Sequence, residues 1–248
     1  MNKREYPKQT RPQWWHNMLD LLLPPRCVLC AQPSPSICIC PACRQDLPWT
    51  GPHCQQCGLP LPNESDDSCG QCVQKAPPFH LTICPLRYEF PVDRLVQALK
   101  FKRQLAEGRV LSHLLCEHVI QHGFDLPGIL IPVPLHRLRL IRRGFNQAYE
   151  LGSYASKVLG IPLQTSGLRR RRNTAAQSGL SRKQRRRNVR GAFYWQDRNR
   201  PGDHVALLDD VMTTGTTVSE CARVLKKAGA RRVDIWVTAR AIPARGSS

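Results

Sequence analysis

Apolar residues recur along this chain in two spacings, one typical of amphipathic helices and one typical of strands. Helical spacing covers residues 13–23, 92–102, 105–122, 144–159 and 218–228. Strands are expected over residues 81–90, 128–133, 192–195 and 233–240. A continuous apolar run from Val205 to Leu208 predicts a further, fully buried strand. Because strands alternate with helices from residue 79 onward, the pattern predicts an α/β fold whose mostly parallel sheet is flanked by helices.

Proline pairs and changes in composition divide the chain into three parts. Pro24-Pro25 ends the first helix, and Pro77-Pro78 closes a cysteine-rich stretch. We expect a tail with a short amphipathic helix over residues 1–25, a small module over 26–78 and the α/β domain over 79–243. No apolar run approaches the ~20 residues that a membrane span requires, and no signal peptide is visible. The sequence therefore predicts a soluble, cytoplasmic protein.

Nine of the twelve cysteines fall between residues 27 and 72, mostly as C-x-x-C pairs. Two such pairs joined by a short loop place four thiolates around Zn²⁺ at about 2.3 Å, which leaves no position for a catalytic water. We expect about two structural zinc ions, held by Cys27, Cys30, Cys40, Cys43, Cys54, Cys57, Cys69 and Cys72. Two alternatives remain: Cys38 could replace Cys40, and the pairs could combine in an interleaved rather than a sequential order.

Two adjacent carboxylates, Asp209 and Asp210, stand at the expected carboxyl end of the buried strand. Seven small or apolar residues separate them from the next helix: Val211, Met212, Thr213, Thr214, Gly215, Thr216 and Thr217. Hydroxyl and amide groups at a helix N-terminus suit a phosphate, and the carboxylates suit ribose hydroxyls or Mg²⁺. Phosphoribosyl pyrophosphate (PRPP) with Mg²⁺ combines these groups and is the predicted ligand. The alternative is a polar turn in which the acids cap the following helix.

A second candidate anion site follows the strand expected over residues 128–133. It comprises a turn stiffened by proline and two of the arginines after it: Val133, Pro134, Leu135, Arg137 and Arg143. Guanidinium groups beside a strand end suit a pyrophosphate. The same residues also fit a solvated basic turn ahead of an amphipathic helix.

The charge of the chain is strongly positive. It has 37 Lys and Arg against 18 Asp and Glu, a formal net charge of +19, which indicates polyanionic ligands or partners. Residues 169–190 contain ten basic residues and no acid. Candidates for nucleic-acid contact are Arg169, Arg170, Arg171, Arg172, Arg182, Lys183, Arg185, Arg186 and Arg187. This segment could also be a mobile loop that closes over a reacting centre, or a disordered basic loop.

Together these motifs resemble the ComF family of competence proteins. The double C-x-x-C sets, Pro132-Val-Pro-Leu135, Arg143-Gly-Phe-Asn-Gln-Ala148 and the segment 209–217 occur in the family's order, and the resemblance spans residues 26 to about 243. It implies a double zinc ribbon followed by a type I phosphoribosyltransferase domain. In that domain Asp209 and Asp210 would hold the ribose hydroxyls and Mg²⁺, residues 213–217 the 5′-phosphate, and the 133–135 turn with nearby arginines the pyrophosphate.

Two functions remain open at this point. The family resemblance implies a factor in DNA uptake, natural transformation or DNA utilisation that binds single-stranded DNA and PRPP, with a ComFA-like helicase as a partner. The alternative is a salvage phosphoribosyltransferase that transfers ribose 5-phosphate from PRPP to a small base, with no role in DNA handling. The chain has few aromatic residues to stack on bases, and Trp49, Phe79 and Trp195 are the candidates.

Overall fold

The computed structural model describes residues 25–34, 37–63, 66–172 and 182–242, and the chain divides into two compact units at residue 45. The smaller unit contains the first two C-x-x-C pairs and the short helix α2 (Pro41–Gln45). The amphipathic helix expected over residues 13–23 lies outside the described residues. Everything else described below belongs to the larger unit, residues 46–248.

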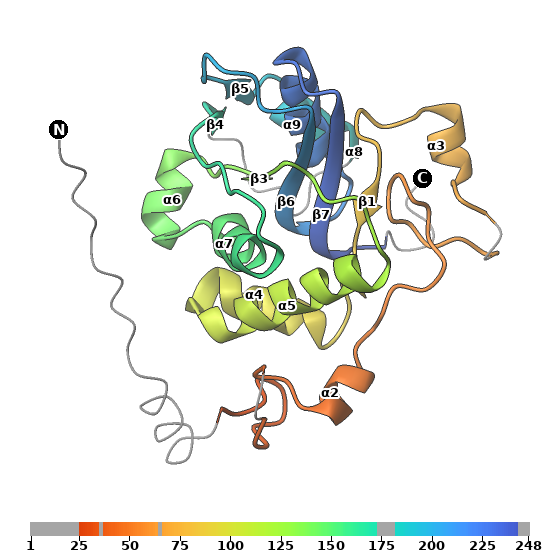
Figure 1. Cartoon of the computed structure of the whole chain (residues 1–248), viewed down its shortest axis with the longest axis vertical. Coiled ribbons are helices and arrows are strands. Elements are labelled where there is room, and N and C mark those ends of the chain that lie inside the picture. The colour runs from red at the N-terminus through yellow and green to blue at the C-terminus, as the bar shows by residue number, and fades with distance from the viewer. Residues whose placement is uncertain (1–24, 35–36, 64–65, 173–181, 243–248) are drawn as a thin grey trace. The chain divides into compact units, whose positions relative to one another are not determined.

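A parallel sheet of five strands forms the centre of the larger unit (Figure 1). Strand β7 (Arg232–Arg240) pairs on one side with β1 (Thr82–Ile83) and β2 (Leu86–Arg87). On its other side lies β6 (His204–Met212), which in turn pairs with β3 (Ile129–Pro132). All of these pairings are parallel, as the alternation of strands and helices predicted. The carboxyl ends of all five strands therefore point toward the same edge of the sheet.

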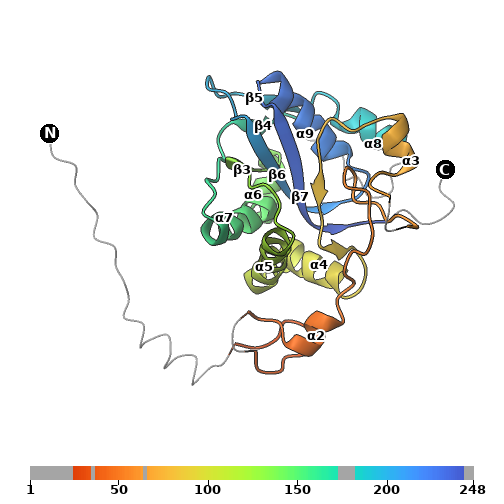
Figure 2. The same ribbon diagram turned by 45° about the vertical axis from the view of Figure 1, so that its right-hand side comes forward.

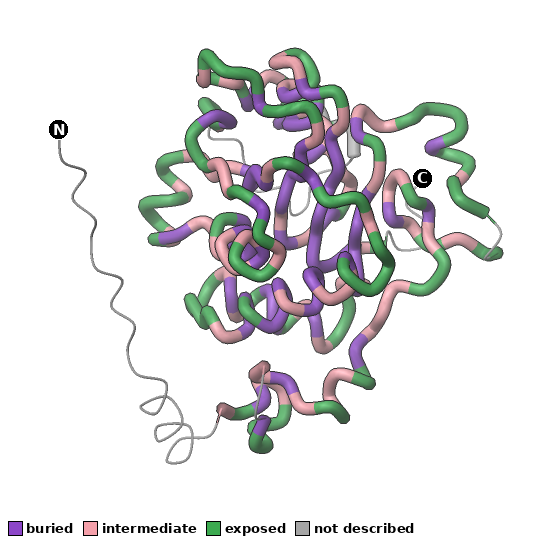
Figure 3. Tube along the Cα trace, viewed as in Figure 1, coloured by how far each residue is buried: buried purple, intermediate pink, exposed green. Residues whose placement is uncertain are grey.

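Helices cover both faces of this sheet (Figures 1 and 2). One face carries α4 (Val92–Lys102), α5 (Leu105–Gln121) and α7 (Gln147–Leu159), and the other carries α9 (Thr216–Lys227). Strands β6 and β7 are buried along most of their length because helices cover them on both sides (Figure 3). This explains the continuous apolar runs in both strands. Among the described residues, no helix is both long enough and apolar enough to cross a bilayer.

Smaller elements surround the sheet. Strands β4 (Leu168–Arg170) and β5 (Phe193–Trp195) form an antiparallel pair. Helix α8 (Arg182–Val189) precedes β5, and helix α3 (Gly70–Gln74) carries the last cysteine of the second set. Gly167 precedes β4 where a Cβ atom would lie 2.2 Å from the ring of Trp195, so the indole packs directly on the backbone. The third helix of this group, α6 (Arg137–Arg143), follows β3.

Several sequence expectations need correction. The strand expected over residues 81–90 is two short strands, β1 and β2, separated by Cys84-Pro85. The basic turn after β3 is the helix α6, whose N-cap is His136: its ring nitrogen accepts a hydrogen bond from the amide of Leu138 at 3.3 Å. The basic stretch 169–190 likewise begins in a strand and ends in a helix, with residues 173–181 outside the described part. Local capping and pairing, which apolar spacing does not report, produce these elements.

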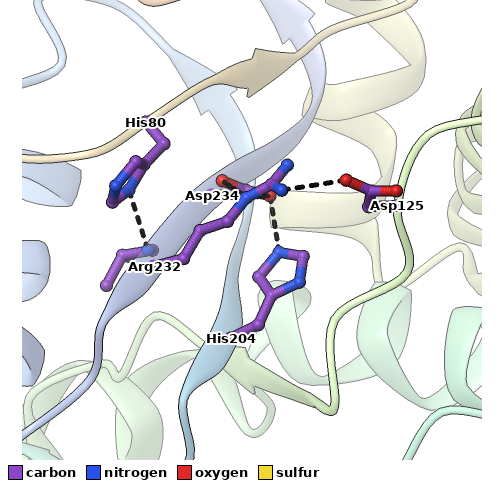
Figure 4. A network of polar contacts seen from close by, with 6 residues as sticks. His80, Asp125, His204, Arg232 and Asp234 are labelled. Atoms are coloured by element: carbon purple, nitrogen blue, oxygen red, sulfur yellow. Dashed lines mark hydrogen bonds and ion pairs between the residues drawn. The ribbon is translucent and has the colours of Figure 1, made fainter.

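Buried charges tie strands β6 and β7 together at the amino edge of the sheet (Figure 4). Asp234 is 1% exposed, and its Oδ2 lies 2.7 Å from Nε2 of His204 and 3.1 Å from Nε of Arg232. Nη1 of Arg232 lies 3.0 Å from Oδ2 of Asp125. His80 accepts a hydrogen bond from the amide of Val233 at 3.2 Å. This network lies at the opposite end of the strands from the candidate site.

Candidate functional site

The two acids of the central motif lie within β6, not beyond its end. The strand continues to Met212, so Asp209 and Asp210 follow the alternation of the strand and point to opposite faces of the sheet. Leu207 packs in the buried cluster that includes Cys221 of α9, whereas Leu208 lies beside Gly152 of α7. Asp209 therefore lies on the α9 side of the sheet and Asp210 on the side covered by α4 and α7.

A lysine that the sequence analysis did not single out neutralises Asp210. Nζ of Lys100, in the last turn of α4, lies 2.5 Å from Oδ2 of Asp210, whose side chain is 5% exposed. Burial alone would lower the pKa of Lys100, but the carboxylate of Asp210 outweighs it, so the pKa is raised and the ammonium stays charged. Burial, together with the charge of Asp210, raises the pKa of Asp209 to about 8. The site therefore favours a cation beside these acids.

The segment after β6 is a tight turn into α9. Gly215 is the N-cap of α9 and has φ of +69°, a conformation that glycine adopts at little cost. The hydroxyls of Thr214 and Thr216 lie 2.7 Å apart. The helix begins at Thr216, two residues before its expected start at 218, and its first turn contains no acid. The amides of this turn and the threonine hydroxyls form a cradle of the kind that binds phosphate.

A cavity of about 360 Å³ opens at the carboxyl edge of the sheet, where β2, β3 and β6 end. Eleven of the residues predicted to bind PRPP line it: Val133, Leu135, Arg143, Asp209, Asp210, Val211, Met212, Thr213, Gly215, Thr216 and Thr217. The other three do not line it: Pro134, Arg137 and Thr214. The side chain of Arg137 is exposed, and Thr214 lines a neighbouring cavity behind the turn.

Seven further residues complete the cavity wall, and of these only Arg139 was among the arginines that the sequence reasoning placed beside the pyrophosphate: Tyr88, Lys100, Phe101, Arg139, Gln147, Arg170 and Val218. Arg139 and Arg143 are four residues apart in α6, so they share one face of this helix, and Nη1 of Arg143 donates to Oε1 of Gln147 at 2.6 Å. That spacing explains why Arg139, one of the arginines expected beside the pyrophosphate, lines the cavity together with Arg143. No local signal marks Lys100, which reaches the site from a helix far away in sequence.

The described residues of the basic segment 169–190 differ in their relation to the cavity. Arg170, expected to contact nucleic acid, lines the cavity, with its guanidinium 5.2 Å from the centre of the Phe193 ring. Arg169, Arg171, Arg172 and Arg187 are exposed. Arg171 and Arg172 donate to the carbonyls of Gly191 and Arg190, which holds β4 against the segment before β5. The other candidates, Arg182, Lys183, Arg185 and Arg186, belong to α8.

Both sets of four thiols are assembled in sequential order. The sulfur atoms of Cys27, Cys30, Cys40 and Cys43 all lie within 4.8 Å of one another, as do those of Cys54, Cys57, Cys69 and Cys72. Cys30 and Cys40 are 3.6 Å apart and Cys57 and Cys69 3.7 Å apart. A tetrahedral Zn²⁺ with bonds of about 2.3 Å needs sulfurs about 3.8 Å apart, so two Cys₄ sites fit two structural zinc ions. Cys40 and not Cys38 completes the first set.

Backbone amides favour the thiolate form at one cysteine of each set. Burial would raise the pKa of Cys27, but hydrogen bonds from the amides of Cys30, Cys40 and Leu29 outweigh it and lower this pKa to about 6. At Cys54, too, burial would raise the pKa, but hydrogen bonds from the amides of Cys69 and Cys57 outweigh it and lower this pKa to about 7. Such amides stabilise negative sulfur and are what a zinc knuckle requires. Cys84, Cys116 and Cys221 are buried core residues, each at most 1% exposed.

The aromatic residues named from the sequence as stacking platforms are only partly available. Phe79 is 4% exposed and packs in the core, so that expectation is wrong for Phe79. Trp49 and Trp195 are half-buried, and the indole of Trp195 donates to the carbonyl of Asn199 at 2.9 Å. The exposed phenylalanines are instead Phe101, at 73%, and Phe90, at 67%. Both flank α4.

Known proteins resemble this chain in two ways. Residues 18–85 match the model of the double zinc ribbon domain. The DNA utilization protein YhgH of Escherichia coli (strain K12) is 36% identical over 228 residues, which cover 90% of this chain and all of that protein. Competence protein F of Haemophilus influenzae is 36% identical over 209 residues, covering 82% of this chain and 90% of the relative.

Solved structures of phosphoribosyltransferases match this chain at lower sequence identity than these relatives do. The glutamine PRPP amidotransferase from B. subtilis is 20% identical, with a TM-score of 0.36, and covers 53% of this chain and 26% of that protein. The purine phosphoribosyltransferase from Pyrococcus horikoshii is also 20% identical, with a TM-score of 0.30, and covers 53% of this chain and 82% of that one.

Proposed function

Since the chain belongs to the ComF family, whose relatives are named for competence and DNA utilization, we propose that it handles incoming single-stranded DNA and binds PRPP with Mg²⁺ at the edge of its sheet. We further propose that it works in the cytoplasm with a ComFA-like helicase. We also propose that the chain comprises a tail over 1–25, a zinc module over 26–78 and a phosphoribosyltransferase domain over 79–243.

One observation carries the PRPP proposal: a carboxylate pair and a phosphate cradle share a single cavity with four basic side chains. The acids are Asp209 and Asp210, and the cradle is the turn 213–217, of which every residue but Thr214 lines the cavity. The basic side chains are Lys100, Arg139, Arg143 and Arg170. PRPP presents a monophosphate, a ribose diol and a pyrophosphate in that order, and the cavity offers partners of matching charge to each group.

The carboxylates also fit Mg²⁺, which takes oxygen ligands and keeps several waters. Lys100 already neutralises Asp210, whereas burial and the charge of Asp210 raise the pKa of Asp209, so a cation beside Asp209 would favour its carboxylate form. When bound, Mg²⁺ would supply charge neutralisation to the pyrophosphate and ribose oxygens. Asp209 and Asp210 would hold it and the diol, on the two sides of strand β6.

The transfer reaction, where it occurs, displaces pyrophosphate from C1 of the ribose. Arg139 and Arg143 would hold the leaving pyrophosphate, because they face the cavity from one side of α6. The turn 213–217 would fix the 5′-phosphate and thereby set the orientation of C1. Catalysis of this kind depends on positioning and on charges arranged before the reaction starts.

DNA binding is supported by charge. The net charge of +19 and the exposed arginines beside β4 suit the phosphate backbone of a nucleic acid. The second candidate function is a salvage phosphoribosyltransferase for a small base, and the cavity volume of about 360 Å³ is in the range of small-molecule sites. Pyrophosphate release that depends on an added base would favour this second function.

Calorimetric titration with PRPP and Mg²⁺ tests the proposal directly. The full chain should bind PRPP, and Asp209→Asn with Asp210→Asn should abolish that binding while leaving affinity for an oligothymidylate intact. Asp203→Asn is the matched control, because Asp203 is an exposed acid at the amino end of β6. Wild-type protein that binds the oligothymidylate but no PRPP would refute the nucleotide site and leave only a DNA-binding scaffold.

A further inference from the structure

A phenylalanine ring stands exposed at the mouth of the PRPP cavity. Phe101 lines this cavity and is nevertheless 73% exposed. It directly follows Lys100 in the last turn of α4, and successive helical residues point about 100° apart. Lys100 therefore reaches Asp210 inside the cavity while Phe101 remains at its rim. A large apolar ring in this position keeps its surface in water until a ligand covers it.

An arginine of the same cavity accompanies the ring. The guanidinium carbon of Arg143 lies 5.7 Å from the centre of the Phe101 ring, and Nη1 of the same guanidinium donates a 2.6 Å hydrogen bond to Gln147. The rim thus combines a flat apolar face with a positive charge held in place. Nucleobases bind to such pairs, because the base stacks on the ring and the attached phosphates meet the cations.

We infer that Phe101, with Arg143 beside it, is a stacking platform for a nucleobase at the mouth of the PRPP cavity. This inference rests on the proposed function, because it places the base next to the site where ribose 5-phosphate would be held. The base could come from single-stranded DNA or could be a free base. The chemistry recognised is the same in both cases: a planar aromatic heterocycle next to anionic groups.

The chain offers a matched comparison at the other end of the same helix. Phe90 is 67% exposed and has the guanidinium of Arg94 5.1 Å from its ring centre, yet it does not line the cavity. Phe90 and Phe101 are therefore alike in exposure and in their arginine neighbour and differ in their relation to the cavity. A role specific to the cavity mouth predicts that only Phe101 matters.

The test measures the affinity of the full chain for three probes by fluorescence anisotropy and calorimetry. The probes are a labelled twelve-residue oligothymidylate, an abasic oligomer of equal length and charge, and free adenine in the presence of PRPP and Mg²⁺. The variants are Phe101→Ala, Phe101→Trp and Phe90→Ala. Circular dichroism checks that each variant is folded, and PRPP affinity is measured on each one separately.

If the base comes from DNA, Phe101→Ala should weaken oligothymidylate binding about tenfold and leave the abasic oligomer unaffected, since stacking acts on bases alone. If the base is free, the loss should instead appear with adenine. Phe101→Trp should retain binding in either case. Equal losses with the abasic oligomer, equal losses in Phe90→Ala, or no loss with either base probe would overturn the inference. Wild-type protein without PRPP affinity would refute the proposed function, while the oligothymidylate comparison would still decide the role of Phe101.

Discussion

The side chain of Arg240 donates a hydrogen bond from Nε to the backbone carbonyl of Cys57, at 2.8 Å. Its Nη1 donates to the carbonyls of Met212, at 2.9 Å, and of Thr213. Arg240 is the last residue of β7 and is 4% exposed, so one buried guanidinium joins the second cysteine set to the start of the phosphate cradle. Both partners belong to the larger unit of the chain.

Replacing Arg240 should therefore lower both the stability of the protein and its affinity for PRPP. Arg240→Gln leaves several buried carbonyls without their donor and should lower the free energy of unfolding by about 3 kcal/mol. It should also weaken PRPP binding, because the turn after Met212 loses its anchor. Urea unfolding and calorimetry measure the two effects. Arg231→Gln, at an exposed arginine whose side chain is 77% accessible, should change neither quantity measurably.

The two cysteine sets should bind zinc independently, because they belong to different compact units. Wild-type protein should release about two zinc ions to a colorimetric indicator after its thiols are modified, and Cys30→Ser and Cys57→Ser should each release about one. Chelators should remove zinc from the first set sooner, since Cys30 is exposed whereas Cys54 and Cys72 of the second set are buried. A complete loss of zinc in either single variant would contradict this independence.

The ion pair between Lys100 and Asp210 should be visible in a double-mutant cycle. Lys100→Met leaves the buried carboxylate uncompensated and should destabilise the protein by about 3 kcal/mol in the absence of ligand. Adding Asp210→Asn should recover much of that loss, because the charge is then removed as well. Chemical denaturation of the four proteins gives the coupling energy. Additive losses would mean that the two groups do not interact in solution.

The polar network at the opposite edge of the sheet offers a prediction about stability alone. Asp234→Asn weakens contacts of a 1% exposed carboxylate to His204 and Arg232 and should cost about 3 kcal/mol of unfolding free energy. Asp125→Asn alters the outer end of the same network, where the side chain is 79% exposed, and should cost less than about 1 kcal/mol. PRPP affinity should remain unchanged in both variants, since the network lies far from the cavity.

The sequence predicted those parts of the fold that depend on burial. Residues 92–102 repeat their apolar side chains at helical spacing and form α4 with those bounds, and the apolar run from Val205 lies in the centre of the sheet. Helix α6 was missed because no residue of it is buried, so apolar spacing carries no information there. Its formation depends on the capping interaction of His136 and on neighbouring elements.

The candidate site was predictable where it is continuous in sequence. The acids and the turn after them stand together in one segment, and so do the thiols of each zinc set. Lys100, Phe101 and Arg170 reach the cavity from separate elements, and only the packing of α4 and β4 around the sheet brings them there. Such convergence of distant segments is a property of the tertiary fold and leaves no local pattern.

The embedding of Asp209 and Asp210 in a paired strand constrains the length of β6 as well as its composition. Asp209 is in register with Val237, and the hydroxyl of Thr238 donates to the carbonyl of Asp210 at 2.7 Å. Inserting or deleting one residue between Val205 and Asp209 would exchange the faces of the two acids and present the wrong carboxylate to Lys100. Exchanges between apolar residues in β6 therefore leave the two acids on their faces of the sheet. A change in the number of residues before Asp209 removes the pairing of Asp210 with Lys100.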